Sequence, residues 1–170
     1  GRKIPEQYWN EVFYTEKYKD FLDNAFPNHG KEDVPNDDRI VLFYTDEKGN
    51  ITNVTGRALG QSKVRYCTIK ITDDKKLFGV HRLQSDKPVY VLEGQFDSFF
   101  IENSIATGDS NLGSYDAAEA ILVYDNEPRN KEIVKIINKA IKNDRYVVLF
   151  PDTVPFKDIN EMIVGGMSQN

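Results

Sequence analysis

Four short apolar stretches in the second half of this 170-residue chain constrain its fold more than any other feature of the sequence. They are residues 88–92, 104–107, 120–124 and 146–150. Short apolar runs bounded by turn residues are typical of strands that a parallel sheet buries on both faces. Helical patterns fall between them at residues 96–102 and 128–142, and a last helix is expected from residue 158. This alternation predicts right-handed crossovers and a mostly parallel sheet flanked by helices.

The first half of the chain has a different pattern, in which strands follow one another directly. Three β-rich stretches are the expected strands: residues 39–45, 51–55 and 65–71. The first two are separated by residues 46–50, DEKGN, which predict a hairpin turn. Residues 5–24 carry apolar side chains close to helical spacing and predict one amphipathic helix.

These two patterns predict an α/β protein with two domains. Residues 1–84 are expected to form a smaller α+β subdomain with antiparallel strands, and residues 85–170 the mostly parallel α/β domain. No apolar run approaches the ~20 residues that a membrane span needs. The single Cys67 excludes a disulfide framework, so we expect a protein of the reducing cytoplasm.

Acidic residues follow two of the expected parallel strands. The first strand ends in Glu93, Gly94 and, three residues later, Asp97, and the third ends in Asp125 and Glu127. The carboxyl ends of parallel strands meet at one edge of the sheet, where ligands bind in open α/β folds. Carboxylate oxygens at such an edge suit Mg²⁺ or Mn²⁺. The combination of both patterns predicts a metal-dependent site.

A fifth acid, Asp158, stands near the start of the last helix. It is a candidate metal ligand, but residues 158–161, DINE, also match a capping box, in which Asp158 has a purely structural role. Both interpretations stay open at the level of the sequence.

The charge is unevenly distributed along the chain. The formal net charge is −5, which alone argues against nucleic-acid binding. Between residues 54 and 82, however, two acidic residues face seven basic ones: Arg57, Lys63, Arg65, Lys70, Lys75, Lys76 and Arg82. Such a run is either a solvated face or a track for phosphates.

The motifs that follow the strands resemble those of the Toprim domain, a metal-binding module of bacterial-type primases, topoisomerases and some nucleases. Residues 91–97, VLEGQFD, resemble its first motif, and residues 121–127, ILVYDNE, its second, where the family usually has D-x-D. Residues 157–161, KDINE, resemble the K-D-P-D-E stretch of primases. Glu127 in place of the usual Asp keeps the charge but moves it outward by one methylene.

Upstream residues narrow the resemblance to the catalytic core of bacterial-type DNA primases. The hairpin and the following GRAL segment at residues 56–59 resemble the amino-terminal subdomain of that core. Residues 65–66, RY, stand where the family has Lys-Tyr, and residues 77–80, LFGV, where it has L-Y-G-L. The sequence of residues 123–131, VYDNEPRNK, resembles the sequences of primases of large tailed bacteriophages. The resemblance covers most of the chain, although one cysteine cannot supply the family's zinc-binding domain, which indicates a fragment.

The resemblance implies template-directed synthesis of RNA primers from ribonucleoside triphosphates on single-stranded DNA, with a replicative helicase as partner and Mg²⁺ or Mn²⁺ as cofactor. It implies catalytic roles for Glu93, Asp97 and Asp125. The implied metal ligands are Glu93, Asp125, Glu127 and Asp158. The implied DNA and nucleotide contacts are Arg57, Lys63, Arg65, Tyr66 and Arg82.

Two other functions fit the same motifs. A Toprim nuclease uses the same acids for hydrolysis, but it does not need the GRAL subdomain. A non-catalytic DNA- or helicase-binding module keeps the fold with relaxed metal ligands, of which Glu127 is a possible sign.

Overall fold

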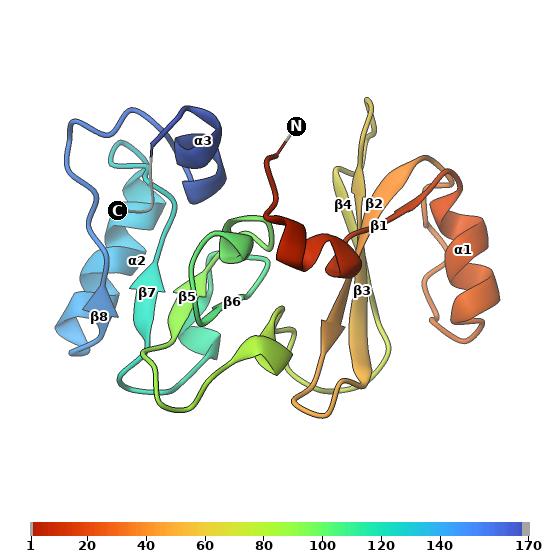
Figure 1. Cartoon of the computed structure of the whole chain (residues 1–170), viewed down its shortest axis with the longest axis horizontal. Coiled ribbons are helices and arrows are strands. Elements are labelled where there is room, and N and C mark those ends of the chain that lie inside the picture. Colours follow the sequence, from red (N-terminus) through yellow and green to blue (C-terminus); the bar gives the residue numbers. More distant parts are fainter. Residues whose placement is uncertain (1, 168–170) are drawn as a thin grey trace. The chain divides into compact units, whose positions relative to one another are not determined.

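The computed structural model describes residues 2–167, and its chain divides into two compact units. One unit comprises residues 6–76, and the other combines residues 1–5 with residues 77–170 (Figure 1). The polypeptide therefore passes from one unit to the other twice, and each unit is described by itself. Within the described residues, none of the helices has the length and apolar character that a membrane span requires. The predicted functional division after residue 84 stays a prediction.

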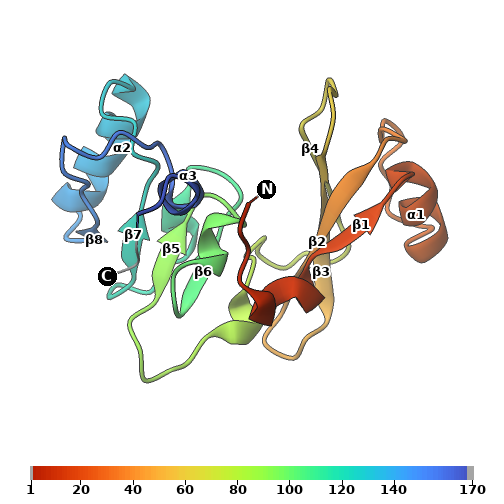
Figure 2. The same ribbon diagram turned by 45° about the horizontal axis from the view of Figure 1, so that its top comes forward.

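The unit of residues 6–76 is built on an antiparallel sheet in the order β1-β2-β3-β4 (Figure 2). The strands are β1 (Phe13–Thr15), β2 (Arg39–Thr45), β3 (Ile51–Ala58) and β4 (Tyr66–Lys70). A 3₁₀ helix, η1 (Glu6–Glu11), precedes β1, and α1 (Tyr18–Ala25) follows it. Tyr18 and Leu22 of α1 pack with Val54 and Cys67 of the sheet, so α1 buries its apolar stripe against β3 and β4.

The prediction of one helix over residues 5–24 is wrong. Its middle, β1, pairs with β2 in the register Phe13↔Val41, and this pairing interrupts the helical pattern. Aromatic and β-branched residues favour strands, and the edge of the sheet offers hydrogen-bond partners that a helix would not use. Helical spacing of apolar residues survives only in α1, where Tyr18 and Leu22 are buried.

The second unit contains the parallel sheet, in the order β6-β5-β7-β8. Its strands are β5 (Tyr90–Leu92), β6 (Ser104–Ala106), β7 (Ile121–Val123) and β8 (Tyr146–Val147). The α-helices are α2 (Lys131–Lys142) and α3 (Ile159–Val164). Three single-turn 3₁₀ helices connect the strands: η2 (Val80–Arg82), η3 (Asp97–Phe99) and η4 (Leu112–Ser114). The expected helix at residues 96–102 is thus only the short η3.

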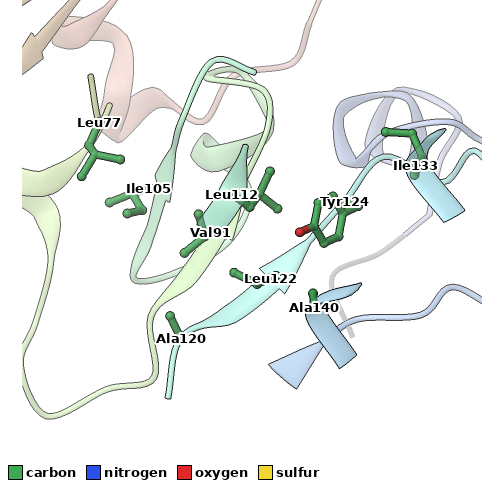
Figure 3. Close-up of a cluster of buried hydrophobic side chains, with 9 residues drawn as sticks. All are labelled: Leu77, Val91, Ile105, Leu112, Ala120, Leu122, Tyr124, Ile133 and Ala140. Carbon is green, nitrogen blue, oxygen red and sulfur yellow. The ribbon is translucent and has the colours of Figure 1, made fainter. Parts of the chain in front are cut away.

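The core of this unit lies between the sheet and α2 (Figure 3). Val91, Ile105 and Leu122 from three adjacent strands are at most 1% exposed, and Ile133 and Ala140 of α2 pack against the same cluster. The helical pattern at residues 128–142 thus places Ile133, Ile136, Ile137 and Ala140 on the face that packs against the core, whereas Ile141 is 46% exposed. The α/β fold class, with a parallel sheet and a separate antiparallel part, is confirmed.

Candidate active site

Glu93 and Asp125 meet at the carboxyl edge of the parallel sheet. Leu92 and Val123, the last residues of β5 and β7, are partners in register, so the two acids leave neighbouring strands at the same level. The backbone N–H of Asp125 donates to Glu93 Oε1 over 3.4 Å. The two acidic motifs of the sequence are thus brought together, as their positions after parallel strands predicted.

Lys157 supplies a positive charge to this group of acids. Its Nζ lies 2.6 Å from Glu127 Oε1 and 3.3 Å from Asp125 Oδ2. The ammonium group lowers the pKa of Glu127, and the two carboxylates in turn raise the pKa of Lys157. Burial raises the pKa of Asp125, and Lys157 works against that shift. Lys157 is part of the KDINE motif, but the pattern of that motif predicted no role for it.

Asn126, for which the sequence pattern predicted no role, holds Lys157 in place. Its backbone N–H donates to the Lys157 carbonyl over 2.6 Å. Its Nδ2 donates to the carbonyls of Val154 and Phe156 over 3.0 and 2.9 Å. The middle residue of the Asp125-x-Glu127 pattern therefore anchors the segment that carries the opposing cation. The amide group of Asn126 carries two N–H donors, and this was the one signal in the sequence that the residue between Asp125 and Glu127 could anchor another segment.

Glu93 has a strongly shifted pKa. Burial raises the pKa of its carboxyl from 4.5 to about 7, and the negative charges of Asp125 and Glu127 add to the effect. The backbone N–H of Asp125 and the charge of Lys157 oppose the shift only in part. A carboxyl with a pKa near 7 exchanges protons readily at neutral pH.

Asp97 lies behind Glu93 and supports α3. Its side chain is buried, and its Oδ1 accepts a hydrogen bond from the backbone N–H of Asn160 over 2.8 Å. Burial and the charge of Asp158 raise the pKa of Asp97 to about 7. A Cβ atom at Gly94 would lie 2.0 Å from Asp97 Oδ2, so this close approach requires glycine.

Asn160 also fastens the start of the chain to this unit. Arg2 Nη1 donates to Asn160 Oδ1 over 2.6 Å, and Asn160 Nδ2 donates to the Arg2 carbonyl over 2.7 Å. The Arg2 guanidinium lies 4.5 Å from the centre of the Phe96 ring. Residues at opposite ends of the sequence thus meet beside Asp97.

Asp158 caps α3. Its Oδ1 accepts a hydrogen bond from the backbone N–H of Glu161 over 2.7 Å, and Glu161 Oε2 accepts one from the N–H of Lys157 over 3.0 Å. This is the capping arrangement that the sequence offered as the structural interpretation. The role of Asp158 as a metal ligand stays a prediction.

The chemistry of the donor set fits a hard divalent cation. Glu93, Asp125 and Glu127 supply carboxylate oxygens, and Lys157 is the cation that pairs with them. Burial is the main cause of the raised pKa of Glu93, and the negative charges of Asp125 and Glu127 add a repulsion that a divalent ion would relieve. Within residues 2–167, however, no three His, Cys, Asp or Glu side chains are already gathered in the arrangement of a metal site.

In the other unit, three of the predicted DNA contacts lie together on the sheet. Arg57 of β3 is paired in register with Tyr66 of β4. The guanidinium of Arg57 lies 5.5 Å from the centre of the Tyr66 ring, and that of Arg65 lies 6.0 Å from it. Tyr66 is 40% exposed, so this is a surface cluster of two cations and an aromatic ring rather than core. Such a combination suits a nucleic-acid strand.

Lys63 and Arg82 are the other two predicted DNA contacts, and Arg82 belongs to the other unit. Lys63 is exposed in the connection between β3 and β4. Arg82 is half-buried in the other unit, 5.1 Å from the ring centres of both Phe78 and Phe99, and its Nη2 donates to Ser98 Oγ. The local packing of Arg82 thus accounts for its position. Its contact with DNA stays a prediction.

Arg39 is fully buried, although its position at the start of an expected strand did not predict this. It pairs with Asp37 and donates to the Gly56 carbonyl over 2.9 Å. Its Nη2 also donates to Ser62 Oγ and to the Val64 carbonyl. It therefore fixes the connection that leads into Arg65 and Tyr66.

Comparison with known proteins places these features in context. The chain is 32% identical to the DNA primase of Enterobacteria phage T4 over 170 residues, which covers 96% of this chain and 49% of that protein. The chain thus spans about half the length of the curated relative that it matches. No protein-family model matches it.

Solved structures of primases share the fold. The zinc-binding and RNA polymerase domains of the Aquifex aeolicus primase match 97% of this chain and 51% of that one, with a TM-score of 0.68 and 19% identity. A DNA primase domain from Pseudomonas aeruginosa matches 98% and 65%, also at 0.68, with 16% identity. The primase fragment of the bacteriophage T7 primase-helicase protein matches 76% and 58%, at 0.58, with 20% identity.

Proposed function

Because this chain is a relative of a phage DNA primase and has the fold of primase catalytic cores, we propose that it contains the polymerising centre of a primase. It would join ribonucleoside triphosphates into short RNA primers on a single-stranded DNA template. The observation that carries this proposal is the contact between Glu93 and Asp125 at the carboxyl edge of the parallel sheet. The GRAL segment at residues 56–59, which resembles the amino-terminal subdomain of primase cores, favours a primase over a Toprim nuclease.

Glu93, Asp125 and Glu127, with Asp158 as a further ligand, would hold Mg²⁺ or Mn²⁺, which neutralises the charge of the nucleotide phosphates. Glu93 serves this centre as a ligand or, where it is not bound to the ion, accepts the proton of the attacking 3′-hydroxyl, a role that suits its pKa of about 7. The 3′-oxygen then bonds to the α-phosphorus, and pyrophosphate leaves. Such a reaction depends mainly on positioning and charge neutralisation.

The remaining side chains have positioning roles in this proposal. Asp97 holds α3, and with it Asp158, against the strand that carries Glu93. Lys157 balances the charge of Asp125 and Glu127 before substrates bind. Arg57, Arg65 and Tyr66, with Lys63 and Arg82, would bind the template and the incoming nucleotide.

We further propose a replicative helicase as the partner of this core and the cytoplasm of the infected host as its place of action. The relative from bacteriophage T7 is named as a primase-helicase protein, which supports a helicase as the partner to test first.

The experiment supplies single-stranded DNA, ribonucleotides and Mg²⁺ or Mn²⁺, and looks for short RNA. Glu93→Gln and Asp125→Asn should abolish the product while circular dichroism shows that both variants fold. Product formation by both folded variants would overturn the assignment. Shortening of the DNA in place of RNA synthesis would favour the nuclease.

A further inference from the structure

A row of positive charges lies on the outer face of α2. Five cations line one shallow groove of about 630 Å³ together with Pro128, Val134 and Asn138. They are Arg129, Lys131, Lys135, Lys139 and Lys142. These five are more than half of the eight Lys and Arg residues that follow residue 84, in a part of the chain that is otherwise acidic.

The spacing of these residues follows from helix geometry. In α2, positions 131, 135, 139 and 142 fall on the face opposite Ile133, Ile137 and Ala140. The isoleucine face packs on the core, and Figure 1 shows α2 beside β7 and β8. Burial of one face thus forces the lysines into a single outward row.

The five cations are unpaired in the part of the chain that the structure describes. All five are exposed, and within residues 2–167 none of their side chains forms an ion pair or a hydrogen bond. By contrast, the nearby Lys157 pairs with two carboxylates. Glu132 is the only acid in α2, and it lies outside the lining of the groove. The row therefore forms an uncompensated positive surface, which attracts polyanions.

The row begins next to the candidate active site. Pro128 and Arg129 directly follow Glu127, and Asn130, the N-cap of α2, donates to Glu127 Oε2 over 2.6 Å. Lysines four residues apart are displaced by about 6 Å along a helix axis, which is similar to the separation of phosphates along an extended nucleic-acid strand. From Lys131 to Lys142 the row extends for about 16 Å.

We propose that the groove along α2 binds the phosphate backbone of a single nucleic-acid strand where that strand leaves the active site. This inference rests on the proposed function for the position of the strand. Five of the eight lining residues are cationic, and none is aromatic, so the groove would bind phosphates without stacking bases and without reading sequence. An acidic protein segment is the competing occupant, but Val134 is the only large apolar side chain that the groove offers to anchor one.

The test measures binding of a fluorescein-labelled oligothymidylate by anisotropy at several salt concentrations. Lys131→Gln/Lys135→Gln/Lys142→Gln should weaken binding about tenfold or more at 0.1 M salt and make the slope of log K against log[salt] shallower by about 2, because each phosphate contact contributes about 0.7. The control, Lys17→Gln/Lys31→Gln/Lys48→Gln, removes the same charge from exposed positions in the other unit and should change binding far less. Thermal melting verifies that both triple variants fold.

Equal binding by the two triple variants would overturn the inference. A slope of log K against log[salt] that is unchanged in the groove variant would also overturn it. So would tight binding of polyglutamate by the wild type if the groove variant lost that binding but still bound the oligonucleotide. Primer synthesis by the wild type is scored separately. If the wild type makes primers and the groove variant binds the oligonucleotide as tightly as the wild type, only this inference is refuted. If the groove variant binds more weakly but the wild type makes no primers, only the proposed function is refuted.

Discussion

The backbone N–H of Asn160 donates a hydrogen bond to Asp97 Oδ1 over 2.8 Å, across 63 positions of sequence. This bond joins the turn after β5 to the first turn of α3. Both residues are buried, with Asn160 4% and Asp97 8% exposed. Asp97, the last acid of the VLEGQFD motif, therefore binds the backbone of α3 and holds that helix beside the candidate active site.

Gly94→Ala should destabilise the protein by about 1–3 kcal/mol, because the new methyl group would collide with Asp97 Oδ2. Chemical denaturation measures the change. Asp97→Ala removes the colliding oxygen, so the double variant should lose less stability than the two single losses added together. Strict additivity would mean that the close approach does not constrain Gly94.

The stability of the metal-free protein should fall as the pH rises from about 4 to about 7. Glu93 and Asp97 have folded-state pKa values of about 7, above their ordinary values of 4.5 and 3.8. The folded state therefore binds more protons than the unfolded state in this window. The free energy of unfolding falls as the pH rises, because the folded state must release those protons. Glu93→Gln and Asp97→Asn should each flatten the profile of melting temperature against pH. Profiles of the two variants that run parallel to the wild-type profile would contradict both shifts.

Lys157→Met should raise the affinity for Mn²⁺ by about three- to tenfold, because it removes the cation that pairs with Asp125 and Glu127. Isothermal calorimetry without nucleotide measures the effect. Lys87→Met removes a surface partner of Glu102 and serves as the control, which should leave the affinity unchanged. If Lys157→Met bound Mn²⁺ more weakly, the result would contradict this expectation and show that Lys157 holds Asp125 and Glu127 in position for the ion.

Arg57→Ala should weaken binding of single-stranded DNA and make the salt slope shallower by about 0.7, the contribution of one phosphate contact. Tyr66→Ala should also weaken binding, by about 1–3 kcal/mol, but without a change in slope, because stacking releases no counterions. Anisotropy titrations separate the two. Two variants with the same salt slope would refute this division of roles.

Arg39→Met should cost about 3 kcal/mol or more in free energy of unfolding. The buried guanidinium satisfies Asp37 and three further oxygen acceptors, which the thioether cannot do. Thermal denaturation measures the loss. Lys48→Met, at an exposed turn, provides the comparison and should change stability by less than about 0.5 kcal/mol.

The sequence predicted the parallel sheet well because its strands are short apolar runs separated by turns, and because α2 has a clear isoleucine face. The meeting of Glu93 and Asp125 followed from the geometry of parallel strands. Residues 5–24 were misjudged because the pairing of β1 with β2 depends on partners far along the chain. For the same reason Asn126 and Arg39 were missed, since their carbonyl partners become neighbours only when the chain folds.

The contact of Arg2 with Asn160 has a consequence for the order of folding during synthesis. The ribosome makes Arg2 first and its partner 158 residues later. The intervening residues 6–76 form a compact unit of their own and can fold while Arg2 waits. That unit is in effect an insertion held by two tethers. Its amino-terminal end, at residue 6, is secured only after α3 has been synthesised, so formation of the Arg2–Asn160 contact would report that translation has passed residue 160.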